Sequence, residues 1–365
     1  MGDPFMGKWD RGNPRKRAYV FLAQVCLVTI LICTACSEEL IQDPPPASVP
    51  DTTSHDFVWT PIIIDELDAH GVLHDICYIN DTCIWAVGWI GAGPDYYNAL
   101  RWNGKKWVFE QVPDSIPEAT GPEVHELFAV YGNRPESVWF SHGTRFVHWD
   151  GNRFSTDLST VDQMKGSLTE SWASGPTNIW MGGWNGELVH YNGMKWKRIP
   201  NDIPNEWGIT GMHGHADTLV LAATQYGTTG QTAFYKVIGE SVTFWRQDSL
   251  PQGVHAVWFE HTNNLWTDGS KTFQWDGFRW LDRHSPYAGY GWDMSANNRN
   301  DILICGDICT IRHWNGRNWR SWWKFPGLET ARFWALDYRG DHAWIAGEVG
   351  FPGQGLRPLI LHGER

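Results

Sequence analysis

Short apolar stretches recur along most of this chain, and each is followed by a glycine-containing turn and a second apolar stretch. The second stretch ends in an aromatic residue, then Asn-Gly or Asp-Gly, two further residues and another aromatic residue. The pattern is complete in five segments, 83–107, 137–154, 178–196, 264–280 and 301–319. A truncated copy spans 341–363, and a degenerate copy spans 217–245. Self-similarity of this kind predicts a repeat protein whose units pack against their neighbours.

Within each unit the apolar stretches predict strands, and the Asn-Gly or Asp-Gly pair predicts a hairpin tip. Both central residues of a type I′ turn have positive φ, which Asn, Asp and Gly tolerate best. The predicted tips are Asn103-Gly104, Asp150-Gly151, Asn192-Gly193, Asp276-Gly277 and Asn315-Gly316. The aromatic residue after each tip is expected to begin the outermost strand and to cover the gap to a neighbouring sheet. These aromatic residues are Trp107, Phe154, Trp196, Trp280 and Trp319.

A further apolar stretch precedes the first one of each unit, for example at 73–79, 125–132 and 254–259, so each unit contains four strands. The units begin near residues 73, 125, 168, 209, 254, 291 and 332. Four short strands that repeat at this spacing are typical of a β-propeller. We therefore expect an all-β fold, a single β-propeller with seven four-stranded blades that spans residues 57–365.

The two ends of the chain are predicted to meet in the last blade. The last unit ends after three strands, and residues 55–64 supply a candidate for the fourth, with Trp59 in the position of the trailing aromatic residue. We expect this N-terminal strand to close the ring. The degenerate copy leaves six or eight blades as alternatives. An open solenoid is a further alternative, although an open array needs no borrowed strand.

The N-terminal region has the pattern of an export signal. Five basic side chains lie within residues 8–17, and an apolar run of sixteen residues, 18–33, follows. That length suits a signal peptide and is short for a membrane span. The run ends in Cys33-Thr34-Ala35-Cys36, which resembles the lipobox of bacterial lipoproteins. The resemblance implies that residues 1–35 are a signal peptide and that Cys36 carries a lipid; a plain secretory signal and a single transmembrane anchor are the alternatives.

The segment after Cys36 is expected to be a tether. Residues 36–56 are rich in Pro, Ser and Asp, and such sequence stays extended. The repeats resemble those of exported bacterial propeller lipoproteins, whose units read roughly WAVG…HWDGxxW, and Ser37-Glu38-Glu39 resembles a surface-export signal. These resemblances imply a lipid-anchored protein of the bacterial cell envelope, at the periplasmic or surface face of the outer membrane. Met1 and Met6 are both candidates for the first residue.

Composition narrows the range of partners and cofactors. The chain has 29 Lys+Arg and 41 Asp+Glu, a formal net charge of −12, which disfavours a nucleic-acid partner. Its 14% of aromatic residues excludes a disordered chain. Outside the signal region the cysteines form two close pairs, Cys77/Cys83 and Cys305/Cys309, and an even number in an exported chain favours disulfides. Zinc is the alternative, but no CxxC pair with matching histidines is present, so we expect neither metal nor cofactor.

One short motif resembles a metal site. His213-Gly214-His215-Ala216-Asp217 is similar to the HxHxD motif of metallo-hydrolases, but Thr218 stands where that family has His. The motif falls where we expect the turn between the first two strands of the fourth unit. We therefore interpret it as a polar turn.

The loops on one face of the predicted propeller are candidates for ligand binding. The loops between second and third strands share this face with the loops that join blades, and several of them are long and aromatic. Loops on a rigid scaffold often carry function, and clustered exposed rings mark binding surfaces. The candidates are Trp89, Tyr96, Tyr97, Trp184, Trp207, Tyr226, Tyr287, Tyr290 and Phe351, with the carboxylates Asp307 and Glu348 beside them. The alternative is that these rings only pack against neighbouring loops.

These observations favour a non-catalytic module that binds a glycan or a protein of the cell envelope, or acts as a scaffold there, with no catalytic residue assigned and only its lipid anchor in the membrane. One alternative is a glycoside hydrolase or lyase, in which two carboxylates stand about 5–10 Å apart. Asp268, Asp307 and Glu348 are the acids that would then converge at the mouth of the channel. Another alternative is a structural subunit of a larger envelope complex.

Overall fold

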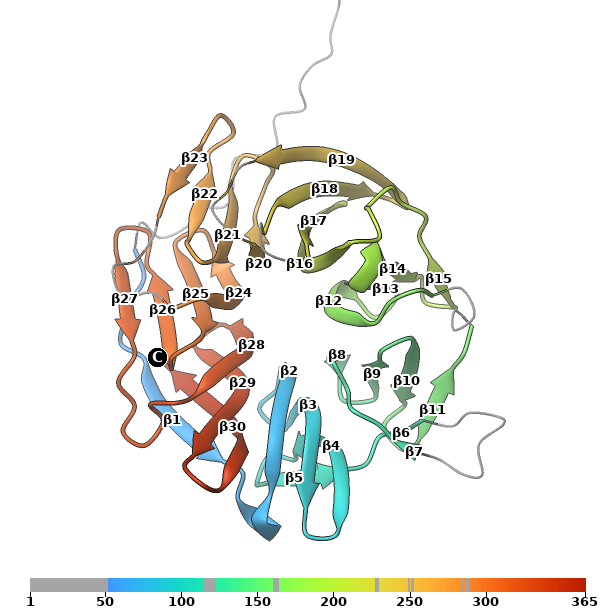
Figure 1. Cartoon of the computed structure of the whole chain (residues 1–365), viewed down its shortest axis with the longest axis vertical. Helices are drawn as coiled ribbons and strands as arrows, with labels where there is room; N and C mark the ends of the chain where they lie inside the picture. Colours follow the sequence, from blue (N-terminus) through green and yellow to red (C-terminus); the bar gives the residue numbers. More distant parts are fainter. Residues whose placement is uncertain are drawn as a thin grey trace, which may run out of the picture. The chain divides into compact units, whose positions relative to one another are not determined.

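The computed structural model of the protein contains seven four-stranded antiparallel sheets (Figure 1). It describes residues 52–114, 123–159, 164–226, 230–248, 250, 253–283, 285 and 289–365. Residues Pro50–Arg365 form one compact unit that is separate from Met1–Val49. Within this unit the sheets follow one another in sequence order around a central axis, which confirms the predicted seven-bladed propeller.

Each blade runs from the innermost strand to the outermost strand in chain order. Blade 1 consists of β2 (His70–Asn80), β3 (Cys83–Ala92), β4 (Asp95–Trp102) and β5 (Trp107–Glu110). Blade 2 consists of β8 (Ala129–Arg134), β9 (Ser137–His142), β10 (Arg145–Trp149) and β11 (Phe154–Asp157). Blade 3 consists of β12 (Leu168–Gly175), β13 (Asn178–Gly183), β14 (Leu188–Tyr191) and β15 (Trp196–Arg198).

Blades 4 to 6 repeat this order. Blade 4 consists of β16 (Trp207–His215), β17 (Thr218–Gln225), β18 (Thr232–Ile238) and β19 (Ser241–Asp248). Blade 5 consists of β20 (Val254–Phe259), β21 (Leu265–Gly269), β22 (Phe273–Trp275) and β23 (Trp280–Asp282). Blade 6 consists of β24 (Gly291–Asn298), β25 (Asp301–Gly306), β26 (Thr310–Trp314) and β27 (Trp319–Trp322).

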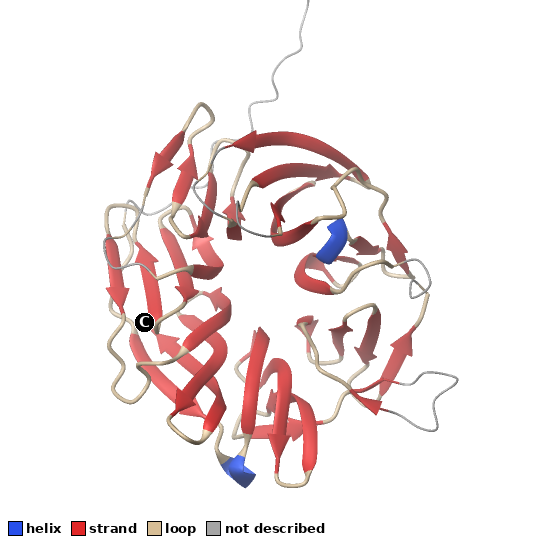
Figure 2. Ribbon diagram, in the orientation of Figure 1, coloured by secondary structure: helices blue, strands red, loops and turns tan. Residues whose placement is uncertain are grey.

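Blade 7 combines both ends of the described chain, β28 (Arg332–Arg339), β29 (His342–Phe351), β30 (Gly355–Glu364) and β1 (Val58–Ile63). A short pair, β6 (Pro113–Asp114) and β7 (Glu123–Val124), lies between blades 1 and 2. Within the described residues, helix is confined to the single 3-10 turns η1 (Glu66–Asp68) and η3 (Trp184–Gly186) (Figure 2). None of these helices is long or apolar enough to cross a membrane.

The N-terminal strand closes the ring, as predicted. β1 pairs antiparallel with β30 in the register from Val58↔Glu364 to Ile63↔Leu359, and Figure 1 shows the blue strand beside the red one. The carboxylate of Asp301 ties the two ends to blade 6. It accepts hydrogen bonds from Arg365 at 3.0 Å on each oxygen and from the Tyr338 hydroxyl at 2.8 Å, and it contacts His313 Nε2 at 2.8 Å. Closure therefore rests on a backbone ladder and on a buried polar cluster.

The hairpin tips differ from the predicted type I′ turns. The aromatic residues that flank each tip are opposite each other, as in Trp275↔Trp280, so four residues connect the strands rather than two. Among the five tips only the glycine has positive φ, for example 95° at Gly277. The Asp276 side chain instead accepts the backbone N–H groups of Phe278 and Arg279 at 2.9 Å each. Asn and Asp are required here because their side chains close the turn.

The trailing aromatic residues cover the gaps between blades, as predicted. Trp196 of blade 3 stacks on Phe146 of blade 2, with ring centroids 3.9 Å apart and planes 8° apart. The same contact with the preceding blade is repeated around the ring, in the pairs Trp107–Trp344, Phe154–Trp85, Trp280–Phe234, Trp319–Trp266 and Trp59–Trp322. The core is thus divided into clusters that each span two adjacent blades. Such rings contribute most of the apolar area that holds neighbouring blades together.

The four cysteines of the propeller are free thiols in the structure, so the predicted disulfides are not formed. The strand register explains why. Cys77 lies opposite Trp85, and Cys83 lies opposite Asn80. The Sγ atom of Cys77 contacts the backbone of Gly132 in blade 2 at 3.2 Å. Cys305 and Cys309 are likewise buried, in the cluster between blades 6 and 7.

Candidate functional site

A β-bulge near the start of the innermost strands directs side chains to one mouth of the channel. In six blades the register with the second strand skips one residue there. In blade 2 Phe128 takes the same position, because its N–H and the paired residue Ala129 both face Ser141. A bulge turns the extra side chain away from the regular alternation. The seven residues are His74, Phe128, Thr169, Thr210, His255, Trp292 and Trp334, and all of them line one cavity.

This mouth cavity has a volume of ≈ 690 Å³ and is lined mainly by aromatic rings. Tyr290, from the connection between blades 5 and 6, lies 4.7 Å from Trp292, and Trp292 lies 4.9 Å from Trp334, measured between ring centroids. On the other side, Trp184 and Tyr226 stack with centroids 4.6 Å apart. Aromatic rings from several blades thus line the cavity, one pair of them stacked and the others tilted, and aromatic lining is typical of a ligand site.

Polar partners behind the rings hold them in place. The indole N–H of Trp292 donates to Asp307 at 2.8 Å, and that of Trp334 donates to Glu348 at 2.6 Å. The Tyr290 hydroxyl donates to the Gly253 carbonyl at 2.8 Å. Burial raises the pKa of Glu348, and the Trp334 hydrogen bond opposes that rise. Both carboxylates thus fix the orientation of a tryptophan, which makes the mouth rigid before a ligand arrives.

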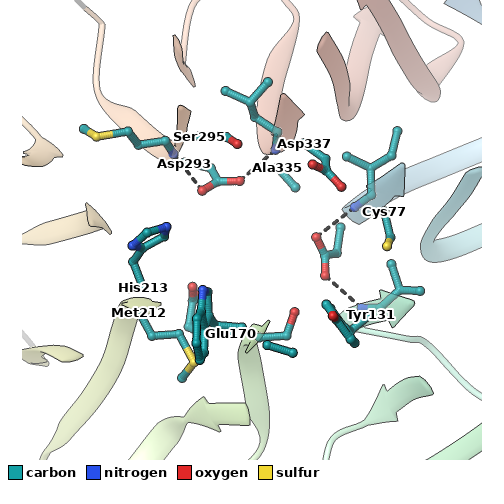
Figure 3. Close-up of a pocket in the computed structure, with 18 of the residues that line it drawn as sticks. Cys77, Tyr131, Glu170, Met212, His213, Asp293, Ser295, Ala335 and Asp337 are labelled. Carbon is teal, nitrogen blue, oxygen red and sulfur yellow. Dashed lines mark hydrogen bonds between the residues drawn. The ribbon is translucent and has the colours of Figure 1, made fainter. Parts of the chain in front are cut away.

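Below the mouth lies the channel cavity, with a volume of ≈ 560 Å³ (Figure 3). The innermost strands line it, and its carboxylates are Asp75, Glu170, Asp293 and Asp337. Figure 3 shows the last three of these around the opening, together with His213. Glu170 lines both cavities, as do five of the bulge residues, so the mouth opens directly into the channel.

Three of the channel carboxylates also link neighbouring blades, and one of them, Asp337 of blade 7, accepts the backbone N–H of Tyr78 in blade 1 at 2.9 Å. Asp75 accepts the backbone N–H groups of Ile76 and of Val130 in blade 2, both at 2.8 Å. Asp293 accepts those of Met294 and of Leu336 in blade 7, both at 2.7 Å. These bonds join innermost strands that share no backbone ladder. Both Asp75 and Asp293 directly follow the bulge residue of their strand.

Burial in the channel raises the pKa of Asp75, Glu170 and Asp293. Burial raises the pKa of Asp75 to about 8 and that of Asp293 to about 6, although the backbone hydrogen bonds oppose both shifts. Burial also raises the pKa of Glu170 well above its usual value, and the charges of Asp293 and Asp75 add to this effect. Like charges in a confined space disfavour simultaneous ionisation. A positive charge that enters the channel would therefore stabilise the ionised form of these carboxyl groups.

The HxHxD segment has no features of a metal site. His213 lies on β16, and its Nδ1 accepts the backbone N–H of Phe259 in blade 5 at 3.3 Å. Burial, with a smaller contribution from His215, lowers the pKa of His213 to about 3. Across the described residues, no group of three or more His, Cys, Asp or Glu side chains is arranged to hold a metal ion. His213 instead joins two blades.

The structure separates the candidates that were read from the sequence. Trp184, Tyr226 and Tyr290 line the mouth cavity. Trp207 is buried in the core cluster of blades 3 and 4, Tyr97 packs against Phe109, and Phe351 packs against the core cluster of blades 6 and 7. Trp89 contacts Tyr96 and His70, and neither Trp89 nor Tyr96 lines either cavity. Tyr287 and Cys36 lie outside the described residues.

The three carboxylates proposed for a hydrolase do not meet at the mouth. Asp268 is fully buried and forms a bidentate ion pair with Arg312, at 2.8 and 3.1 Å. Asp307 and Glu348 each hold a different tryptophan. None of the three lines either cavity. The mouth is lined by aromatic rings, and the carboxyl groups of the channel are Asp75, Glu170, Asp293 and Asp337.

The bulge residues and the channel acids were not among the candidates. Their sequence signal is weak, because a bulge breaks the alternation by which strand faces are read. The order His74-Asp75 in blade 1 and Trp292-Asp293 in blade 6 is a trace of it, since the ring reaches the mouth and the acid reaches the channel. In the other blades a ring and an acid do not occur together, as in Thr169-Glu170, His255-Ala256 and Trp334-Ala335.

Comparison with known proteins supports the fold alone. No protein-family model matches the chain, and no curated protein matches it. Among solved structures, "YCF48 bound to D1 peptide" is similar, with a TM-score of 0.60 and 13% identity over 84% of this chain and 97% of that one. The WD40 β-propeller domain of Doa1 is also similar, with a TM-score of 0.56 and 11% identity over 82% of this chain and 96% of that one. At identities this low, the likeness shows that the protein shares the β-propeller fold of these two proteins.

Proposed function

We propose that this propeller is a non-catalytic module that binds an extended segment of a partner protein at the mouth cavity. The observation that carries the proposal is the ring of bulge residues, which places one side chain from every blade around a cavity of ≈ 690 Å³. A single ring of preset side chains suits a narrow, extended ligand better than a broad protein surface. YCF48, whose fold is similar, was solved with a bound peptide, which supports this use of the fold.

A glycan is the other ligand that the aromatic rings suggest. Sugars are usually held by flat rings together with carboxylates or amides that bind hydroxyl groups. Here Asp307 and Glu348, beside the mouth, already accept indole N–H groups, and Glu170 is the one carboxylate in the lining of the mouth cavity. Aromatic rings outnumber carboxylates in this lining, which favours a peptide side chain over a sugar.

We also propose that a lipid on Cys36 anchors the propeller to the cell envelope. In the described chain, Thr53 and His55 contact turns of blade 6 through Asn300 and Asn318. Those turns join first to second and third to fourth strands, whereas the mouth is lined by loops of the opposite end. Residues 53–55 therefore enter the propeller at the end opposite the mouth.

The test is binding of the unit 50–365, which contains every strand of the ring, to an array of random twelve-residue peptides and to a glycan array. We expect the wild type to retain a set of peptides and the Trp292→Ala, Trp334→Ala double variant to lose them. Phe278→Ala is the matched control, because this ring is 91% exposed on the tip of blade 5. The melting temperature of each variant checks the fold.

Three results would contradict the proposal: retention of no peptide, retention that survives in the folded double variant, or retention of glycans alone. The last result would assign the mouth to a sugar.

A further inference from the structure

We propose that the partner segment inserts one basic side chain, Lys or Arg, between the aromatic rings of the mouth and onto the carboxylates of the channel. This inference rests on the proposed function and names the chemistry that the site selects. It is carried by three observations: the charge balance of the channel, the position of Glu170, and the rings at the entrance.

Acidic side chains outnumber basic ones in the lining of the channel. Four carboxylates line it, and Arg339 is the one Lys or Arg side chain in its lining. That guanidinium is already engaged, since its Nε and Nη2 atoms donate to the two oxygens of Asp337 at 2.9 Å each. Asp75, Glu170 and Asp293 are left without a positive partner. A cation is therefore the ligand group that complements the channel.

Glu170 is the carboxylate placed to meet an incoming side chain. It follows the bulge residue Thr169 on β12 and lines both the mouth and the channel. The corresponding acids, Asp75 and Asp293, each accept two backbone N–H groups. Within the described part of the chain, the Glu170 carboxylate has no such hydrogen-bond partner. Its acceptor capacity is thus available to a ligand.

The rings at the entrance suit a basic side chain as well. Trp292, Trp334 and Tyr290 form a continuous aromatic arc above the channel. A cation over an aromatic face gains electrostatic energy, and the apolar stem of Lys or Arg packs against such rings. A neutral apolar side chain would fill the mouth but would leave the three carboxylates unpaired below it.

Protons provide a readout that packing alone would not change. The pKa of Asp75 is raised to about 8 and that of Asp293 to about 6, mainly by burial, so in the free channel Asp75 holds a proton near neutral pH and Asp293 holds one at about pH 6 and below. A bound cation stabilises the ionised form and releases those protons, so affinity rises as pH rises from 6 to 8. The other titratable groups of the lining are His74, Cys77, Tyr131, Glu170, His213, His255, Asp337, Tyr338 and Arg339.

Histidine titration does not account for such a rise. Burial lowers the pKa of His213 to about 3 and that of His255 to about 4, so both rings are neutral throughout this range. His74 is hydrogen bonded to Glu126 at 2.7 Å. The variant His74→Gln is the control for this ring, and we expect the rise in affinity for the basic peptide between pH 6 and 8 to persist in it.

The experiment uses the peptides retained by the array. We expect them to be enriched in Lys or Arg at one position. One such peptide is then synthesised with its basic residue and with norleucine, which has a neutral side chain of similar length. Calorimetry on the wild type should show about tenfold weaker binding of the norleucine peptide, roughly the effect of 1.4 kcal/mol. The basic peptide alone should gain affinity between pH 6 and 8.

Glu170→Gln locates the effect. This variant keeps the shape of the side chain, and we expect it to weaken the basic peptide about tenfold while changing the norleucine peptide less than twofold. Phe278→Ala should change neither. Three outcomes would overturn the inference and leave peptide binding intact. The retained peptides could lack enrichment in Lys or Arg, the wild type could bind both peptides with equal affinity, or Glu170→Gln could weaken both peptides equally. Retention of no peptide overturns the proposed function itself.

Discussion

Carboxylate side chains occupy three different environments in this propeller. Asp268 is fully buried against Arg312, Thr272 and the N–H of Gly269. Asp307 and Glu348 each accept the indole N–H of a mouth tryptophan. Glu170 lines the channel, and within the described residues its carboxylate has no hydrogen-bond partner. All of these residues are Asp or Glu. The neighbouring groups decide whether the carboxylate stabilises the fold, orients an aromatic ring or keeps free acceptor atoms.

At the residue scale, the Asp268–Arg312 pair is expected to matter most for stability. Both side chains are at most 1% exposed, so Asp268→Ala leaves a buried guanidinium without a counter-charge. Loss of one partner of a buried pair costs about 3–5 kcal/mol in the free energy of unfolding. Urea denaturation measures this cost.

The control is Arg153→Ala, which removes the partner of Asp150 on the surface, where Arg153 is 79% exposed. Exposed pairs contribute about 0–1 kcal/mol. If Asp268→Ala lowers the free energy of unfolding by no more than Arg153→Ala does, the pair does not hold blades 5 and 6 together.

At the element scale, the first few residues of each innermost strand have the same side-chain directions in every blade, but the residue types differ. The residue at the bulge faces the mouth, and the next one faces the channel or the neighbouring blade. Blade 1 places His74 and Asp75 there, blade 6 places Trp292 and Asp293, and blade 7 places Trp334 and Ala335. A common backbone therefore presents a different pair of side chains from each blade.

The closing strand gives a second prediction. A chain that starts at Ile64 lacks β1, so the β30 edge is exposed and the buried ring of Phe57 is lost. Loss of a buried Phe side chain alone costs about 3–5 kcal/mol, and an exposed edge promotes aggregation. We expect a melting temperature at least about 6 °C lower than that of the chain that starts at Pro50. An unchanged melting temperature, with a monomer in light scattering, would contradict closure by this strand.

At the scale of the whole molecule, the two ends of the ring have separate roles in the proposal. The mouth cavity is at one end, and the chain enters β1 past the blade 6 turns of the other end. The net charge of −12 disfavours a polyanionic partner, and the acidic channel favours a basic one. Residues 53–55 thus lie at the end of the propeller opposite the mouth cavity.

The third prediction belongs to this scale and concerns the anchor. If Cys36 carries a lipid, Cys36→Ser abolishes the labelling of the chain by palmitate and moves the protein out of the membrane fraction, or leaves the signal segment uncleaved. Cys33→Ser, three residues earlier, is the matched control and should keep both label and membrane association. Palmitate label that persists in Cys36→Ser but disappears in Cys33→Ser would place the lipid on the other cysteine.

The repeated spacing of strands was sufficient to predict seven blades, because each unit carries its own apolar strands, turn residues and trailing ring. The contact of Trp196 with the neighbouring blade followed from the same local pattern. Closure by 55–64 was also predictable, since a three-stranded last unit needs a fourth strand. The blades and their hairpins depend on residues that are close in sequence, and closure, which pairs Val58–Ile63 with the last strand, was predictable because the repeat itself shows which strand is missing.

The binding site depended on tertiary structure. Trp184, Tyr226 and Tyr290 were found because long aromatic loops are visible in a sequence, whereas Trp207 and Tyr97 looked the same and pack inward. Whether a ring lines the mouth depends on where the bulge falls and on which blade lies beside it. The acids of the channel meet only because the ring closes and brings β2, β12 and β24 to one axis. Contacts between blades 1, 3 and 6 join distant segments, and no local pattern encodes them.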